Sequence, residues 1–138
     1  MDELGRYALP PVAASEAQAR RLLTSCLRPL AEAGALGAQT LADLQLMTSE
    51  LMANAIVHGR STEPIDLVIA ADAGRVRIAV HDHGEGFDPG AVDPTMPAAD
   101  QAGGRGLPLI HILSSDWGAA RTGSMLVWCE VLLAAPAA

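Results

Sequence analysis

The hydrophobic period of the chain changes at Gly59, and this change constrains the fold more than any other feature of the sequence. Before Gly59, largely apolar residues recur at the spacing of one helix face, which predicts a helix from about Ala38 to His58. This face consists of Leu41, Leu44, Thr48, Leu51 and Ala55. After Gly59, segments 65–69 and 75–81 are rich in β-branched residues, which predicts two neighbouring strands. The chain must therefore build a helical layer and a sheet.

Four further segments complete the predicted arrangement. Residues 15–18 have the form of a capping box, so a helix is expected to follow them to about Ala33. A short helix is expected over 106–115, and two strands over 117–121 and 125–133. This order of elements predicts an α+β fold, a two-layer sandwich whose mixed, mostly antiparallel sheet carries helices on one face.

Size and charge narrow the possible functions. The chain has 138 residues, so residues 1–138 are predicted to form one domain. Its formal net charge of −7 argues against direct binding of nucleic acid through a broad basic face. No residue is a lysine, which excludes a Walker-type phosphate loop. The first residues lack a basic region followed by an apolar run, and no stretch of about 18 apolar residues occurs, so we expect no signal peptide and a cytoplasmic protein that does not enter a membrane.

A polar face runs along the predicted second helix. Glu50, Asn54 and His58 recur one turn apart and are expected to point away from the Leu44/Leu51 stripe. A carboxylate and an amide at this spacing can hold a hydrated Mg²⁺ ion or orient a hydroxyl group. The alternative is an ordinary solvated helix face.

Two glycine-containing segments follow. Asp82-His83-Gly84-Glu85-Gly86 begins at a strand end, where the aspartate offers a fixed acceptor beside backbone that a ligand can approach; a plain turn is the alternative. Gly103-Gly104-Arg105-Gly106-Leu107 opens the short helix, where unpaired N–H groups favour an anion; a flexible hinge is the alternative. The irregular stretch between them, 84–104, is long enough to predict a functional or disordered loop.

Two histidines near the first of these segments raise the question of a metal site. His81 and His83 share one face of a strand end, and His111 could be considered as a third histidine ligand. Spacing supplies no third ligand, so we do not expect zinc binding here.

Taken together and in order, the three segments resemble the N box and the two G boxes of the GHKL ATP-binding superfamily, which includes gyrase, Hsp90, MutL and the histidine kinases. Within this superfamily, the segment Glu50–Gly59 is most similar to the N box of the small anti-sigma factor serine/threonine kinases and their actinobacterial relatives. The resemblance spans about residues 15–133. It implies the Bergerat fold and the binding of ATP with Mg²⁺.

The resemblance also assigns roles to residues. Glu50 would be the general base that orients the attacking hydroxyl group, and Asn54 would bind Mg²⁺. Asp82 would accept a hydrogen bond from the adenine amino group, and Gly84 and Gly86 would shape the pocket for the base.

Further implied contacts lie in the second half of the chain. Either Thr122 or Ser124 would touch the adenine through water, and the sequence does not decide between them. Many relatives carry an arginine before the second G box, where this chain has Ala102. The loop 87–103 is expected to act as a lid. The residues expected to line the triphosphate are Gly104, Arg105, Gly106 and Leu107.

Three functions are compatible with this resemblance. The first is a protein serine kinase that phosphorylates an anti-anti-sigma partner of the STAS type and sequesters a sigma factor. The second is an ATP-binding regulator without catalysis. The third is a stand-alone histidine-kinase-type catalytic domain, which normally comes with a phosphoacceptor helix pair that we do not expect here. A homodimer is expected by analogy alone.

Overall fold

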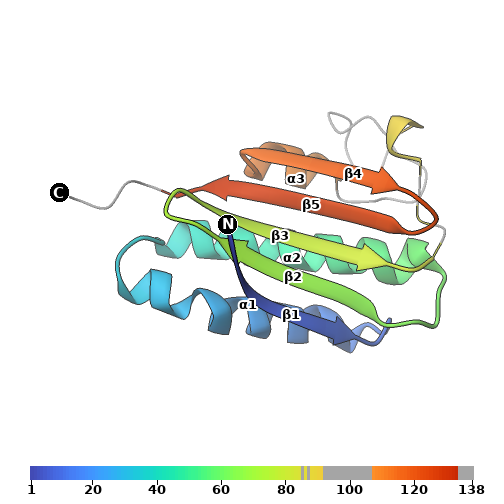
Figure 1. The fold of residues 1–138 in the computed structure, drawn as a ribbon, viewed down its shortest axis with the longest axis horizontal. Helices are drawn as coiled ribbons and strands as arrows, with labels where there is room; N and C mark the ends of the chain where they lie inside the picture. Colours follow the sequence, from blue (N-terminus) through green and yellow to red (C-terminus); the bar gives the residue numbers. More distant parts are fainter. Residues whose placement is uncertain (85, 87, 92–106, 134–138) are drawn as a thin grey trace.

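The computed structural model describes residues 1–84, 86, 88–91 and 107–133, which form a helical layer packed on one face of a sheet (Figure 1). None of the helices in these ranges is both long and apolar enough to span a membrane. The elements, in chain order, are β1 (Asp2–Leu9), α1 (Ala14–Glu32), α2 (Ala38–Gly59), β2 (Ile65–Ala71), β3 (Arg75–Asp82), the short 3₁₀ turn η1 (Pro89–Ala91), α3 (Leu107–Leu113), β4 (Asp116–Arg121) and β5 (Met125–Leu132).

The five described strands have the order β1-β2-β3-β5-β4, and each neighbouring pair is antiparallel. This confirms the predicted α+β sandwich. The edge strand β1 was not predicted from the sequence, and only its last residue, Leu9, is fully buried. Burial alternates from Gly5 to Leu9, but one of the inward positions is a glycine, so the apolar alternation that predicts a half-buried strand is missing.

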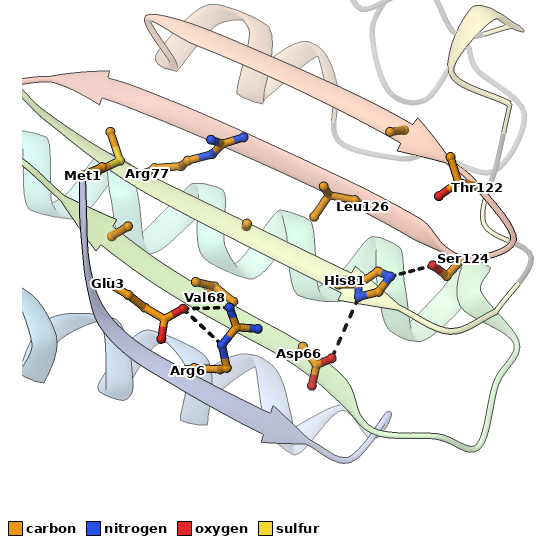
Figure 2. Close-up of a pocket in the computed structure, with 13 residues that line it drawn as sticks. Met1, Glu3, Arg6, Asp66, Val68, Arg77, His81, Thr122, Ser124 and Leu126 are labelled. Atoms are coloured by element: carbon orange, nitrogen blue, oxygen red, sulfur yellow. Dashed lines mark hydrogen bonds and ion pairs between the residues drawn. The ribbon is translucent and has the colours of Figure 1, made fainter.

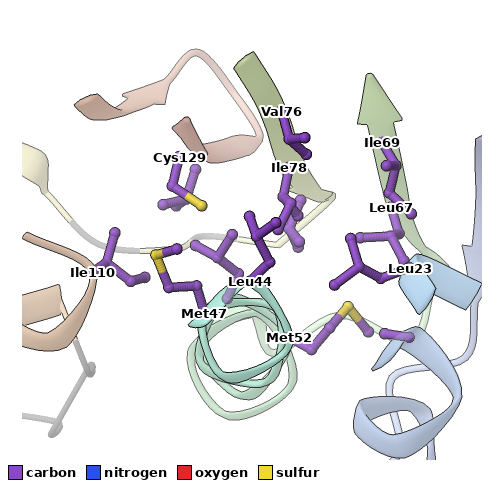
Figure 3. Close-up of a cluster of buried hydrophobic side chains, with 14 of the residues drawn as sticks. Leu23, Leu44, Met47, Met52, Leu67, Ile69, Val76, Ile78, Ile110 and Cys129 are labelled. Atoms are coloured by element: carbon purple, nitrogen blue, oxygen red, sulfur yellow. The ribbon is translucent and has the colours of Figure 1, made fainter. Parts of the chain in front are cut away.

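The core lies between α2 and the middle of the sheet (Figure 3). Leu44, Met47 and Leu51 of α2 are buried against Ile78 of β3 and Cys129 of β5. Each fully buried side chain of this size stabilises the fold by about 1.5–3 kcal/mol. This packing fixes α2 over the ends of β3 and β5, where the candidate site lies.

The predicted capping box at Ser15 is wrong. Helix α1 begins at Ala14, so Ser15 lies inside the first turn and its buried hydroxyl group donates to the carbonyl oxygen of Pro10 at 2.6 Å. No side chain caps this helix start. The hydroxyl group instead ties the helix to the chain that leaves β1.

Candidate functional site

Asp82, the last residue of β3, is 6 % exposed and points toward the helical layer. Its Oδ1 accepts a hydrogen bond from the N–H of Gly84 at 2.9 Å, which fixes the carboxylate at the strand end. Burial raises the pKa of Asp82, while the Gly84 N–H and the neighbouring histidines oppose that rise. The result is a buried acceptor whose direction is set by the backbone.

Glycine is required where the chain leaves β3. A Cβ atom on Gly84 would overlap the backbone carbonyl oxygen of Gly59, the last residue of α2. Gly86 has a φ of +63°, and a Cβ atom there would lie 2.7 Å from Cβ of Met125. These two positions let the segment after Asp82 pass close to both α2 and β5.

Asn54 faces the same pocket as Asp82 and is also 6 % exposed. Asn54 was expected to point away from the apolar stripe of the helix. This expectation is wrong, because the ends of β3 and β5 cover the Asn54 side chain. Its Nδ2 atom is buried and has no hydrogen-bond partner among the described residues. A buried unpaired donor costs about 1–3 kcal/mol, so an acceptor delivered by a ligand would relieve this cost.

The pocket between α2 and the two strand ends is narrow. Its volume is about 10 Å³, which holds about one water molecule. A larger ligand needs part of the wall to move, and Met125 is the most adaptable side chain among the described lining residues. The described residues that line it are Leu51, Asn54, Ala55, His58, Val80, Asp82, Gly86, Met125 and Val127.

Glu50 lies one helical turn before Asn54 and is half-buried. Burial raises the pKa of its carboxyl group, and the negative charge of Glu16 on α1 raises it further. A carboxylate with a raised pKa is a stronger proton acceptor than an ordinary glutamate. His58, one turn after Asn54, lines the pocket itself.

The structure does not bring Thr122 and Ser124 to this pocket. Both line a hollow on the opposite face of the sheet, where Ser124 Oγ lies 2.6 Å from Nε2 of His81 (Figure 2). Side chains alternate along β5, so Met125 takes the position that faces Asp82. The expected contact between Thr122 or Ser124 and the adenine is therefore not supported, and Met125 is the wall residue that sequence reasoning missed.

The second glycine segment is only partly described. Gly104, Arg105 and Gly106 lie outside the described residues, as does most of the expected lid, 87–103. Leu107 begins α3 and is fully buried in the hydrophobic core, so it does not line the pocket around Asp82.

The donor set of the site fits a magnesium nucleotide. The Asn54 amide supplies an oxygen of the hard type that Mg²⁺ takes, and its unpaired nitrogen can donate to an oxygen of the same ligand. The Asp82 carboxylate supplies an acceptor for an amino group.

Residues 12–128 match the family described as histidine kinase-like ATPase domain. A search of curated proteins by sequence gave no match. Among solved structures, the RsbU and RsbW domains of Rv1364c from Mycobacterium tuberculosis have a TM-score of 0.72 at 19% identity, over 96% of this chain and 33% of that one. The chain thus spans about a third of the length of that relative.

Two further solved structures share the fold. The SiaB-SiaC complex from Pseudomonas aeruginosa gives a TM-score of 0.65 at 16% identity, over 94% of this chain and 89% of that one. The histidine kinase domain of the blue-light activated histidine kinase EL346 from Erythrobacter litoralis gives 0.56 at 19% identity, over 90% of this chain and 61% of that one.

Proposed function

The chain belongs to the histidine kinase-like ATPase domain family, and on this basis we propose that it binds ATP with Mg²⁺ in the pocket between α2 and the end of β3. The observation that carries the proposal is the pairing of a buried, incompletely bonded amide on Asn54 with a buried carboxylate on Asp82 in one pocket.

Each polar residue has a distinct task in the proposed complex. Asp82 accepts a hydrogen bond from the adenine amino group, and Gly84 and Gly86 leave room for the base. The amide oxygen of Asn54 holds Mg²⁺. When bound, Mg²⁺ neutralises part of the negative charge on the phosphates. By family resemblance, Gly104, Arg105 and Gly106 line the triphosphate.

Adenine entry requires the pocket to open. The pocket has room for about one water, and Met125 forms its wall beside Gly86. The unbranched side chain of Met125 can adopt several rotamers at small cost, so we propose that it moves aside when the base enters.

The proposed reaction is phosphoryl transfer to a serine of a STAS-type partner in the cytoplasm. The serine oxygen forms a bond to the γ-phosphorus as the bond to ADP breaks, and the Glu50 carboxylate accepts the hydroxyl proton. The raised pKa of Glu50 supports this role. By family resemblance, we further propose that the chain switches between this partner and a sigma factor; the RsbW domain of Rv1364c and the SiaB-SiaC complex share its fold.

A phosphorylation assay, together with a measurement of ATP binding, tests this function. The chain is incubated with Mg²⁺, radiolabelled ATP and STAS-domain proteins from its host, and the product is treated with acid. We expect an acid-stable phosphoserine on one partner with the wild type and with Glu32→Gln, which changes an exposed residue of α1, but not with Glu50→Gln. Acid-labile label would indicate a histidine kinase, and ATP binding without label would indicate a non-catalytic regulator. Absence of ATP binding would overturn the proposal altogether.

A further inference from the structure

We propose that Asp66, His81 and His83 form a binding site for a transition-metal ion, with Zn²⁺ as the best fit, on the face of the sheet opposite the helices. Asp66 lies on β2 directly across from His81 on β3, and His83 follows two residues later. Their candidate ligand atoms all lie within 4.8 Å of one another. Asp82, between the two histidines, points to the other face, so this cluster is separate from the nucleotide pocket.

One carboxylate oxygen of Asp66 lies close to both histidine rings of the cluster. Oδ2 of Asp66 lies 3.3 Å from Nε2 of His83 and 3.9 Å from Nδ1 of His81. Figure 2 shows the second of these contacts, with the His81 ring turned toward Asp66. Ligand atoms around a tetrahedral Zn²⁺ are separated by about 3.3 Å, given bonds of about 2.0–2.1 Å. One distance already has this value, and the others, which reach up to 4.8 Å, would have to shorten when the ion binds.

The other ring nitrogen of each histidine, the one that does not face Asp66, also has a polar neighbour. His81 Nε2 lies 2.6 Å from the Ser124 hydroxyl group, and His83 Nδ1 lies 3.8 Å from Oε2 of Glu63. A histidine that binds a metal through one nitrogen usually donates its other N–H to an acceptor, which fixes the ring and the tautomer. The Ser124 hydroxyl group is within hydrogen-bond distance of His81, whereas the Glu63 carboxylate must move closer before it can accept the N–H of His83. With Nε2 of His81 next to Ser124, Nδ1 of His81 faces Asp66 Oδ2, which also lies beside Nε2 of His83.

The ligand set selects the class of ion. Two imidazole nitrogens and one carboxylate favour Zn²⁺, Co²⁺, Ni²⁺ or Cu²⁺ over Mg²⁺ or Ca²⁺, which prefer oxygen. The three side chains are 32–37% exposed, so an ion can enter from solvent. Three protein ligands leave one tetrahedral position for water or for a group from another molecule.

The test is a titration of the purified chain with Zn²⁺ by calorimetry, and with Co²⁺, whose visible absorption reports tetrahedral coordination. We expect one ion per chain with the wild type. His81→Gln and His83→Gln remove a ligand each and should abolish saturable binding. Ser124→Ala removes only the acceptor behind His81 and should weaken binding by about 10- to 100-fold.

His111→Gln is the matched control. This histidine is exposed and accepts a hydrogen bond from the Trp117 indole at 3.3 Å, outside the cluster. We expect it to leave Zn²⁺ affinity unchanged, and circular dichroism confirms that each variant is folded. Undetectable binding by the wild type, binding that survives in both histidine variants, or equal loss in His111→Gln would each overturn the site. Because the readout is metal binding, its failure would leave the proposed ATP site untouched.

Discussion

The side chains of Asn54 and Asp82 come from different layers of the fold and face one buried pocket. Asn54 lies in the last third of α2, and Asp82 ends β3. Two polar groups buried together in a mostly apolar wall are costly unless a ligand or an internal partner satisfies them. The Gly84 N–H donates a hydrogen bond to one carboxylate oxygen of Asp82, but Nδ2 of Asn54 has no hydrogen-bond partner among the described residues.

The first prediction concerns the cost of that unpaired amide. Asn54→Leu replaces it with an apolar side chain of similar size. Without nucleotide, the free energy of unfolding should rise by about 1–3 kcal/mol, because a buried unsatisfied donor is removed. The same variant should lose binding of ATP with Mg²⁺. Urea denaturation measures the first effect and calorimetry the second; a destabilised variant would mean that the amide is already satisfied.

The second prediction concerns the passage between α2 and the end of β3. Gly84→Ala places a methyl group on the Gly59 carbonyl, so we expect a loss of several kcal/mol in stability, at or above the upper end of the usual range of about 0.5–3 kcal/mol. Gly74→Ala in the β2–β3 turn is the control, because a Cβ atom there would lie 3.7 Å from Asp72 Oδ1, an ordinary van der Waals contact. Thermal denaturation compares them, and equal stability of the two variants would contradict the close passage.

The third prediction separates binding from catalysis. Glu50→Gln keeps the shape of the side chain but cannot accept a proton. General-base assistance contributes about 10²–10⁴-fold in rate, so transfer to the partner should slow by at least about a hundredfold. Affinity for ATP should change little. If the variant failed to bind ATP, Glu50 would have a structural or metal-binding role instead.

The fourth prediction concerns pH. Burial first, and the charge of Glu16 second, raise the pKa of Glu50. A general base acts when ionised, so the transfer rate should fall as the pH drops through this raised pKa. Glu16→Gln removes the charge contribution, and its rate should therefore persist to lower pH than that of the wild type. Rate profiles of the two proteins decide this, and identical profiles would remove Glu16 from the explanation.

Local pattern predicted most of the fold, and the family resemblance named Glu50, Asn54 and Asp82 as site residues. The helical spacing of Glu50 and Asn54 and the position of Asp82 at a strand end follow from hydrophobic period. Strand register does not, because it depends on pairing between distant segments. For this reason the sequence left open where Ser124 points, missed the wall residue Met125, and supplied no third ligand for His81 and His83, although Asp66 lies directly across from His81.

The central claim is that Asp82 recognises adenine in the pocket that it shares with Asn54. Calorimetric titration of the wild type and Asp82→Asn with ATP and GTP in the presence of Mg²⁺ tests it most directly. A hydrogen bond to a charged acceptor contributes about 1.5–3 kcal/mol, which corresponds to roughly a ten- to hundredfold change in affinity. We expect Asp82→Asn to weaken ATP binding by that factor and to narrow the preference for ATP over GTP. Unchanged affinity and unchanged selectivity would show that the adenine does not bind to Asp82.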